Sequence, residues 1–259
     1  MIPKIIHFTW FSNDAYPQKV RKCMESWRQF LPDYKIVHWD MDSVKDIDVP
    51  FLKEALSEKK WAFAADYVRL YAVYNYGGIY LDTDVMVYRS FDSLLSHSCF
   101  IGREHSWHWI DGHITACYLS SHCFGAEKGH LYIKETMDYY ANIHFVKTQN
   151  GNFPKLLKYD MTILPYAQAI FARKYGYNWN LSANHIQRLG DKLIIYPSNY
   201  FDRTNGKEIS YCKHLAVGSW REISAREDKV SLGYKVEWRI IALVAYFLKK
   251  FGYMIIRTT

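Results

Sequence analysis

The sequence predicts an α/β fold in which helices flank a mostly parallel, Rossmann-like sheet. Three observations support this prediction. Strand-like and helix-like segments alternate from residue 4 to residue 88, which is the rhythm of parallel strands joined by crossover helices. Two glycines, Gly77 and Gly78, end a long helical pattern. Two aspartates then follow an apolar strand, at the place where open α/β sheets bind ligands.

The first two elements are a strand and a helix. Residues 4–10 are mostly apolar and predict a buried strand that ends at Trp10. Pro17 is well suited to begin the helix that follows. The apolar face of this helix repeats at helical spacing, through Val20, Met24, Trp27 and Leu31.

The remaining elements continue the same alternation. Residues 34–40 predict a second strand, and residues 51–76 carry helical segments up to the two glycines. Residues 79–88 predict a third strand with its exit loop. Beyond residue 95 the pattern is less regular, and residues 191–201 predict one further strand with an exit loop.

The composition is that of a folded protein, with 49% hydrophobic and 23% charged residues. The aromatic fraction is 17%, which suits either stacking surfaces for flat or sugar-like ligands or an aromatic-rich core. The formal charge is +7, but the chain has no long Lys/Arg run and no RNA-binding signature. We therefore expect no nucleic-acid partner.

The last 34 residues carry most of the excess positive charge. Residues 226–259 hold seven Lys or Arg and three acidic residues, a net +4 of the +7. They predict a basic amphipathic helix whose longest apolar run, residues 240–248, is too short to cross a bilayer. The tail suits the surface of an anionic membrane, or it packs on the main domain or in a dimer interface. We therefore expect a domain over residues 1–225 and a tail over residues 226–259.

The five cysteines are scattered, without a CxxC pair, and the chain begins without a secretory signal pattern. This predicts reduced thiols and a cytoplasmic protein. Several histidines lie near three of the cysteines in the sequence, which raises the alternative of a zinc site. Their spacings fit no common zinc module, so a polar cleft or surface loops are favoured. The residues concerned are His97, His105, His108, His113, His122 and His130, with Cys99, Cys117 and Cys123.

Four charged residues are predicted to converge at one strand end. Asp82 and Asp84 leave the same side of an extended chain. Asp66 and Arg69 are the charged residues of the stretch from 61 to 81 and share one helix face, either as a structural ion pair or as part of a polar site. Two close carboxylates repel each other unless a cation lies between them, and Mg²⁺ and Mn²⁺ prefer oxygen ligands. A metal site that also holds a diphosphate is therefore predicted.

The order of several motifs resembles glycosyltransferase family 32. These are "IPKIIHFTW", "ESW", "AADYVRLYAVYNYGGIYLDTDV", "IIYPSNYF" and "HLAVGSW", which span roughly residues 2 to 220. The family includes bacterial capsular polysaccharide enzymes, fungal initiating mannosyltransferases and the catalytic domains of clostridial glucosylating toxins. The resemblance implies a GT-A fold, a nucleotide-sugar donor, Mn²⁺ or Mg²⁺, and retention of anomeric configuration.

The resemblance also implies roles for the residues of the central motif. Asp84 is expected to bind the metal directly, and Asp82 to contact the ribose, the donor sugar or metal-bound water. Asp66 and Arg69 resemble contacts to the donor sugar and phosphate, and Tyr80 would support the aspartate pair.

The first and last of these motifs imply further roles. Trp10 would stack near a uracil, and His214 would be a second metal ligand. Ser219 and Trp220 would close over the diphosphate. The chain departs from the family pattern in the segment "WIDGHITACYLSS", where Asp111 or His113 is expected on the acceptor side.

The sequence-based expectation is a metal-dependent retaining hexosyltransferase that acts by front-face attack. A UDP-sugar, with galactose as first choice, would be the donor, and a glycan or lipid-linked glycan in bacterial surface polysaccharide synthesis the acceptor. The location would be the inner face of the cell membrane. Two alternatives stay open: a haloacid dehalogenase-type phosphatase that uses "LDTDV", and a non-catalytic glycan-binding module.

Overall fold

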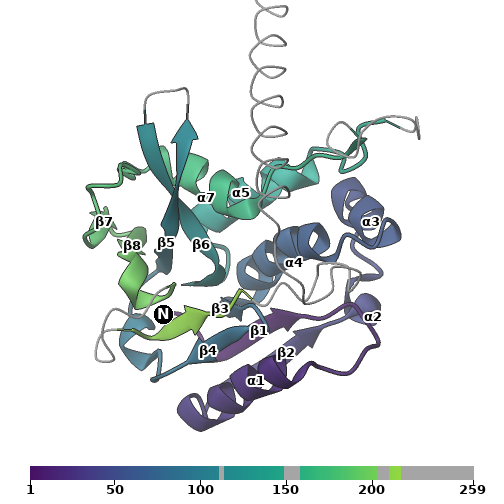
Figure 1. Ribbon diagram of the computed structural model, residues 1–259, viewed down its shortest axis with the longest axis horizontal. Coiled ribbons are helices and arrows are strands. Elements are labelled where there is room, and N and C mark those ends of the chain that lie inside the picture. The colour runs from purple at the N-terminus through teal and green to yellow at the C-terminus, as the bar shows by residue number, and fades with distance from the viewer. Residues whose placement is uncertain (111–113, 149–157, 203–209, 217–259) are drawn as a thin grey trace, which may run out of the picture.

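A seven-stranded sheet forms the centre of the protein in the computed structural model, which describes residues 1–110, 114–148, 158–202 and 210–216 (Figure 1). The strand order is β2-β1-β3-β6-β5-β8-β7. Five strands point the same way, while β6 and β7 run antiparallel to their neighbours. The predicted class, a mostly parallel sheet flanked by helices, is confirmed. The strands are β1 (Ile5–Thr9), β2 (Lys35–Trp39), β3 (Gly78–Leu81), β5 (Cys99–Ile110), β6 (Ile114–Ala126), β7 (Gln187–Leu189) and β8 (Leu193–Tyr196).

The first predicted helix is α1 (Gln18–Phe30), which begins directly after Pro17. Its expected apolar face is buried, with Val20 and Trp27 fully inaccessible to solvent. Trp27 also donates its indole N–H to the carbonyl oxygen of Val85 at 2.8 Å. The helix therefore anchors the segment that follows the two aspartates.

The predicted helical stretch before the glycines forms α3 (Pro50–Ser57) and α4 (Trp61–Tyr76), preceded by the short α2 (Met41–Val44). The glycines end α4 because both have positive φ, +68° at Gly77 and +109° at Gly78. A Cβ on Gly78 would lie 2.7 Å from the carbonyl oxygen of Ile5. Glycine therefore lets α4 turn sharply into β3 close beside β1.

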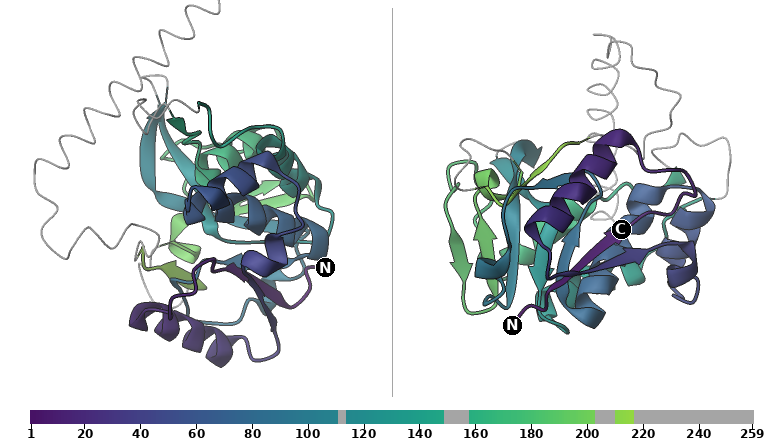
Figure 2. Two further views of the ribbon diagram at one scale, coloured as in Figure 1. Left: turned by 90° about the vertical axis from the view of Figure 1, so that its right-hand side faces the viewer. Right: turned by 90° about the horizontal axis from the view of Figure 1, so that it is seen from below.

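Two apolar layers cover the sheet. One face packs against α3, α4, α5 (Leu131–Ala141) and α7 (Leu164–Arg173). The other face packs against α1, which lies across it when the molecule is seen from below (Figure 2, right). A two-stranded ribbon of β4 (Val85–Val87) and β9 (Cys212–His214) joins this second layer. The short helices η1 (Asp92–Leu94) and η2 (Ser198–Tyr200) lie beside it.

The long antiparallel pair β5–β6 projects at one end of the sheet (Figure 1) and was not predicted from the sequence. Its register shifts between Ile101 and Arg103 and again before Trp107, so simple alternation of apolar residues is lost. The predicted strand at 191–201 is β8 followed by η2. All five cysteines are described, and each is a buried free thiol.

Within the described ranges, no helix combines the length and apolar character needed to span a bilayer. The tail predicted over residues 226–259 lies outside the described residues, and the division at residue 225 stays a prediction.

Candidate active site

The two aspartates lie in the turn that joins β3 to β4. β3 is fully buried between β1 and β6 and ends at Leu81. The backbone N–H of Asp82 still donates to the carbonyl oxygen of His122 on β6, at 2.9 Å, and its carbonyl accepts from Val85 at 3.0 Å. This fixes the turn, so Asp82 and Asp84 are held at the carboxyl end of a central strand as predicted.

Arg69 organises one side of the site. Its Nη2 lies 3.3 Å from Oδ1 of Asp66 and 3.4 Å from Oδ1 of Asp82. Its Nη1 donates to the carbonyl oxygen of Ser121 at 3.0 Å and to the Ser121 hydroxyl at 3.1 Å. The guanidinium lies 4.8 Å from the ring centre of Tyr80. The predicted convergence of Asp66, Arg69 and Asp82 is therefore present, around a buried cation.

Asp66 is the most enclosed carboxylate of this group, with 7% of the residue exposed. Its Oδ2 accepts from the backbone N–H of Leu164, the first residue of α7, at 3.1 Å. Burial raises the pKa of Asp66 to about 6, although the Arg69 charge opposes this. Asp66 is thus mostly ionised at neutral pH and ties α4 to α7.

Tyr80 supports Asp82 from within β3. Its hydroxyl donates to Oδ1 of Asp82 at 3.0 Å and lies 2.9 Å from the hydroxyl of Thr9 on β1. Burial raises the pKa of Tyr80 well above its ordinary value, so the hydroxyl keeps its proton. Asp82 therefore receives two fixed donors, a phenol and a guanidinium.

His214 approaches Asp84 from a distant part of the chain. β9 pairs antiparallel with β4, and the register places His214 opposite Val85. Its Nε2 lies 3.2 Å from Oδ1 of Asp84. Burial disfavours the charged imidazole, but the hydrogen bond and charge of Asp84 outweigh burial and raise the pKa of His214.

The donor atoms of Asp82, Asp84 and His214 all lie within 4.8 Å of one another. Two carboxylates and one imidazole form a ligand set that suits Mn²⁺ or Mg²⁺, with positions left for other oxygen ligands. Asp84 has 7% of its surface exposed and His214 only 28% of its side chain, so both are held rather than free to move in solvent. The residues present therefore fit a divalent cation.

The remaining predicted site residues are Trp10, which the structure describes, and four residues that lie outside the described ranges. Trp10 follows β1 at the same edge of the sheet, where its indole donates to the carbonyl oxygen of Asp14 and packs on Tyr16 at 5.0 Å. Its predicted contact with a base stays a prediction. Ser219 and Trp220 lie outside the described residues, as do Asp111 and His113.

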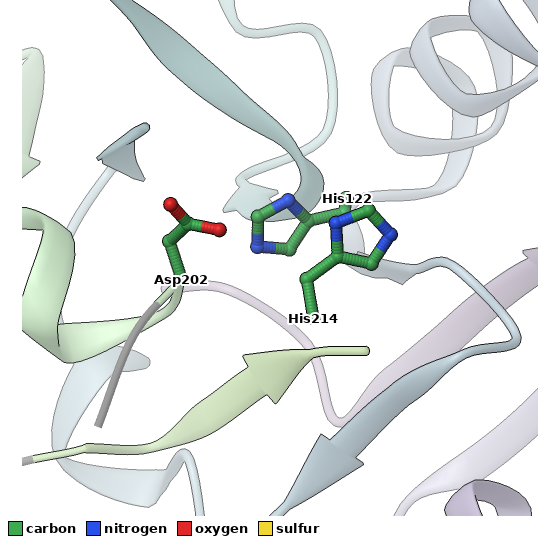
Figure 3. Close-up of side chains that lie close together, drawn as sticks. All are labelled: His122, Asp202 and His214. Atoms are coloured by element: carbon green, nitrogen blue, oxygen red, sulfur yellow. The ribbon is translucent and has the colours of Figure 1, made fainter. Parts of the chain in front are cut away.

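Three residues near the site were not predicted to belong to it. Ser121 and His122 lie on β6 beside the aspartate turn, and Asp202 follows η2. The His122 ring stacks on the His214 ring, with centres 4.4 Å apart, and both lie beside Asp202 (Figure 3). The signal in the sequence was the polar run Ser120–Ser121–His122 in an otherwise apolar strand.

The zinc alternative drawn from the sequence placed histidines with cysteines. Among the described residues, the groups that could hold a metal contain no cysteine, and His122 is their one member from that set. Burial and the neighbouring His214 lower the pKa of His122 to about 3, so its ring is neutral.

Comparison with known proteins shows which proteins this region resembles. Residues 17–101 match the family described as "Glycosyltransferase sugar-binding region containing DXD motif". This part of the chain is therefore similar to DXD-containing glycosyltransferases. This region runs from the start of α1 through Asp66, Arg69, Asp82 and Asp84. The predicted resemblance to DXD glycosyltransferases is confirmed. The two aspartates, Asp82 and Asp84, follow a central strand of a mostly parallel sheet, as expected for the predicted GT-A type.

Two fungal relatives resemble the chain over this region. Inositol phosphoceramide mannosyltransferase 3 of Schizosaccharomyces pombe is 33% identical over 159 residues, which is 60% of this chain and 40% of that protein. Mannosyl phosphorylinositol ceramide synthase SUR1 of Saccharomyces cerevisiae is 29% identical over 105 residues, 39% of this chain and 27% of that protein. The chain thus spans less than half the length of these curated relatives.

Two solved structures are similar at lower identity. One is a glycosyltransferase involved in the glycosylation of the major capsid of PBCV-1, with TM-score 0.45, 12% identity and coverage of 82% of this chain and 93% of that one. The other is the PaToxG glycosyltransferase, with TM-score 0.42, 20% identity and coverage of 53% and 59%.

Proposed function

We propose that the protein is a metal-dependent retaining glycosyltransferase that moves a hexose from a nucleotide sugar to a glycan or lipid-linked acceptor. The observation that carries this proposal is the convergence of Asp82, Asp84 and His214 within 4.8 Å, beside the buried Arg69. The matched DXD sugar-binding region supports it.

In this proposal Asp84, Asp82 and His214 hold Mn²⁺ or Mg²⁺. A bound divalent cation supplies charge neutralisation to the diphosphate leaving group. Arg69 holds Asp82 in place through Nη2, which lies 3.4 Å from Oδ1 of that carboxylate. The Tyr80 hydroxyl donates to the same oxygen, Oδ1 of Asp82. The protein groups are therefore oriented before the donor binds, which is the condition for electrostatic catalysis.

Asp66 and Arg69 are proposed to position the donor sugar and its phosphates. Both side chains are held by backbone hydrogen bonds: Asp66 accepts from the N–H of Leu164, and Arg69 donates to the carbonyl oxygen of Ser121. Of this group Asp82 is the most open, with 25% of its side chain exposed, against 9% for Asp66. Asp82 is thus the carboxylate best placed to accept from a sugar or ribose hydroxyl. Transfer with retention would then proceed by front-face attack of the acceptor hydroxyl.

The identity of the sugar is a finer proposal with two candidates. The sequence-based expectation is a UDP-sugar, galactose first, in bacterial surface polysaccharide synthesis. The names of the fungal relatives favour mannose as the second candidate, with an inositol phosphoceramide acceptor. Both candidates use the same metal and diphosphate chemistry.

A nucleotide-sugar panel tests this proposal. UDP-galactose, UDP-glucose, UDP-N-acetylglucosamine and GDP-mannose are incubated with the full chain and Mn²⁺, and release of nucleoside diphosphate is measured without acceptor. We expect slow release from one nucleotide class, which stops when EDTA is added. Hydrolysis of a generic phosphomonoester without such release would instead indicate the phosphatase alternative. Sugar binding without nucleotide binding would indicate the glycan-binding alternative.

We also propose that residues 226–259 bring the protein to an anionic membrane surface, as a peripheral protein on the cytoplasmic face. The excess of basic residues in this tail supports the proposal. The test is co-sedimentation with vesicles that contain anionic lipid, for the full chain and a version that ends at Ser231. Only the full chain should pellet, and added salt should weaken it. Equal sedimentation of both proteins would contradict the membrane role.

A further inference from the structure

A second group of potential metal ligands lies beside the DXD site, the name used here for Asp82, Asp84 and His214. The donor atoms of His122, Asp202 and His214 all lie within 4.8 Å of one another, and His214 belongs to both groups. Figure 3 shows the Asp202 carboxylate directed toward the two stacked imidazoles. They come from three separate segments: His122 from β6, Asp202 from the residues after η2, and His214 from β9.

The surroundings of His122 favour coordination. Its Nε2 lies 3.2 Å from the carbonyl oxygen of Phe201. A carbonyl oxygen only accepts, so Nε2 carries the proton and donates it. In the neutral ring the lone pair then belongs to Nδ1. Metal-binding histidines are usually held in this way, with the other ring N–H donated to a backbone carbonyl.

Asp202 is oriented in a comparable manner. Its Oδ2 accepts from the backbone N–H of His105 at 2.5 Å. This fixes the carboxylate while leaving Oδ1 for another partner. His122 and Asp202 therefore each have a backbone hydrogen bond that orients the side chain, as is usual for metal ligands.

We propose that His122, Asp202 and His214 form a second cation site, selective for Zn²⁺ and similar borderline metals, that competes with the DXD site for His214. Two imidazoles and one carboxylate are a common zinc set with one open position. The DXD group has the opposite balance, two carboxylates and one imidazole, which suits Mn²⁺ or Mg²⁺. Zinc bound at the second site would withdraw His214 from Asp84 and weaken Mn²⁺ binding. The competition rests on the proposed function, whereas the zinc site itself does not.

The test measures Zn²⁺ binding to the full chain by calorimetry, with Co²⁺ visible absorption as a spectroscopic check. Asp84→Asn removes a ligand of the DXD site alone, so it should keep Zn²⁺ binding and lose Mn²⁺ binding. Asp202→Asn should lose Zn²⁺ binding and keep Mn²⁺ binding. Its amide oxygen still accepts from His105, so the variant keeps the local fold. Groups that only orient a ligand already contribute about 10–100-fold to metal affinity, so losing the ligand itself should weaken Zn²⁺ binding at least tenfold.

His185→Gln is the matched control, because it removes an exposed imidazole elsewhere and should leave Zn²⁺ binding unchanged. Excess Mn²⁺ should also raise the apparent Kd for Zn²⁺ in the wild type. Loss of Zn²⁺ binding in Asp84→Asn, or undiminished binding in Asp202→Asn, would overturn the second site. Independent binding of the two metals would overturn the sharing of His214. Failure of nucleotide-sugar turnover would affect the proposed function and leave the zinc result intact.

Discussion

The two halves of the site satisfy their carboxylates in different ways. In the arginine half, a buried guanidinium lies between two acids and every group has a protein partner; its members are Asp66, Arg69, Tyr80, Asp82 and Ser121. In the imidazole half, carboxylates meet histidines and backbone N–H groups; its members are Asp84, His122, Asp202 and His214. The arginine half contains its own cation, the Arg69 guanidinium. The imidazole half, together with Asp82, has the ligands that an external cation requires.

This difference indicates that the two halves have different roles, one mainly in stability and the other mainly in ligand binding. The arginine half lies inside the fold and joins α4, α7 and β6, so it contributes to stability as well as to the site. The imidazole half lies beside the β4–β9 ribbon, which brings His214 to Asp84. We expect this half to contribute mainly to ligand binding. Substitutions in the two halves should therefore separate stability from metal-dependent activity.

The largest effect is expected for Arg69→Ala. Removing the guanidinium leaves Asp66 buried without its cation, which should cost about 3–5 kcal/mol of folding free energy. Urea unfolding measures this cost. Lys53→Ala is the matched control, because Lys53 belongs to an exposed ion pair with Asp48 and should cost little. A free energy of unfolding equal to that of the wild type would show that the arginine half is not structural.

Asp84→Asn should lower activity strongly and stability little, the opposite of what is expected for Arg69→Ala. It removes charge from the proposed metal ligand and should lower Mn²⁺-dependent release of nucleoside diphosphate by about 100-fold or more. Its melting temperature should fall far less than that of Arg69→Ala, because one of two neighbouring like charges is removed. Asp48→Asn changes an exposed carboxylate away from the site and serves as the control. Wild-type turnover in Asp84→Asn would contradict the metal role.

Tyr80→Phe tests whether Tyr80 contributes to stability or to metal binding. The phenol donates to Asp82 and contacts Thr9, so its loss should cost about 0.5–1.5 kcal/mol of stability. Because Asp82 keeps Arg69, metal affinity should fall less than in Asp84→Asn. Calorimetric titration with Mn²⁺ compares the two variants. A Tyr80→Phe loss as large as that of Asp84→Asn would place Tyr80 in the metal-binding half.

The smallest effect is the pH dependence that Asp66 contributes to stability. Its folded pKa of about 6 lies above the ordinary value of 3.8. The stabilising contribution of the protonated form is therefore fully present below pH 3.8 and is lost as pH rises through 6. Relative to Asp66→Asn, the wild type should gain about 1 kcal/mol between pH 7 and pH 5. Urea unfolding of both proteins at the two pH values measures this, and an unchanged difference would contradict the raised pKa.

The two halves also differ in how well the sequence predicts them. The arginine half was predicted because four of its five residues lie between 66 and 82, where helix spacing and the glycine stop relate them directly. Ser121 was missed because it reaches Arg69 only through the pairing of β3 with β6. The resemblance to the family supplied His214, which no local pattern around "KHL" would indicate.

The other two members of the imidazole half, His122 and Asp202, were not predicted to meet, and the reason is topological. His122 and Asp202 are separated by 80 positions and meet only because β6 and η2 both lie beside the β4–β9 ribbon. The strands that bring them there carry register shifts at Ile101–Trp107, which interrupt the period-two pattern on which strand prediction depends. The first strands and helices follow regular patterns and were predicted within a few residues.

We propose that Asp84 and His214 of the imidazole half, together with Asp82, bind a divalent cation on which nucleotide binding depends. The most direct test is calorimetric titration of UDP and of GDP into the full chain, with Mn²⁺ or with EDTA, for the wild type and Asp84→Asn. We expect one nucleotide to bind the wild type when Mn²⁺ is present. That binding should be lost when EDTA replaces Mn²⁺, and it should also be lost in the Asp84→Asn variant. Equal nucleotide affinity with Mn²⁺ and with EDTA would contradict the claim.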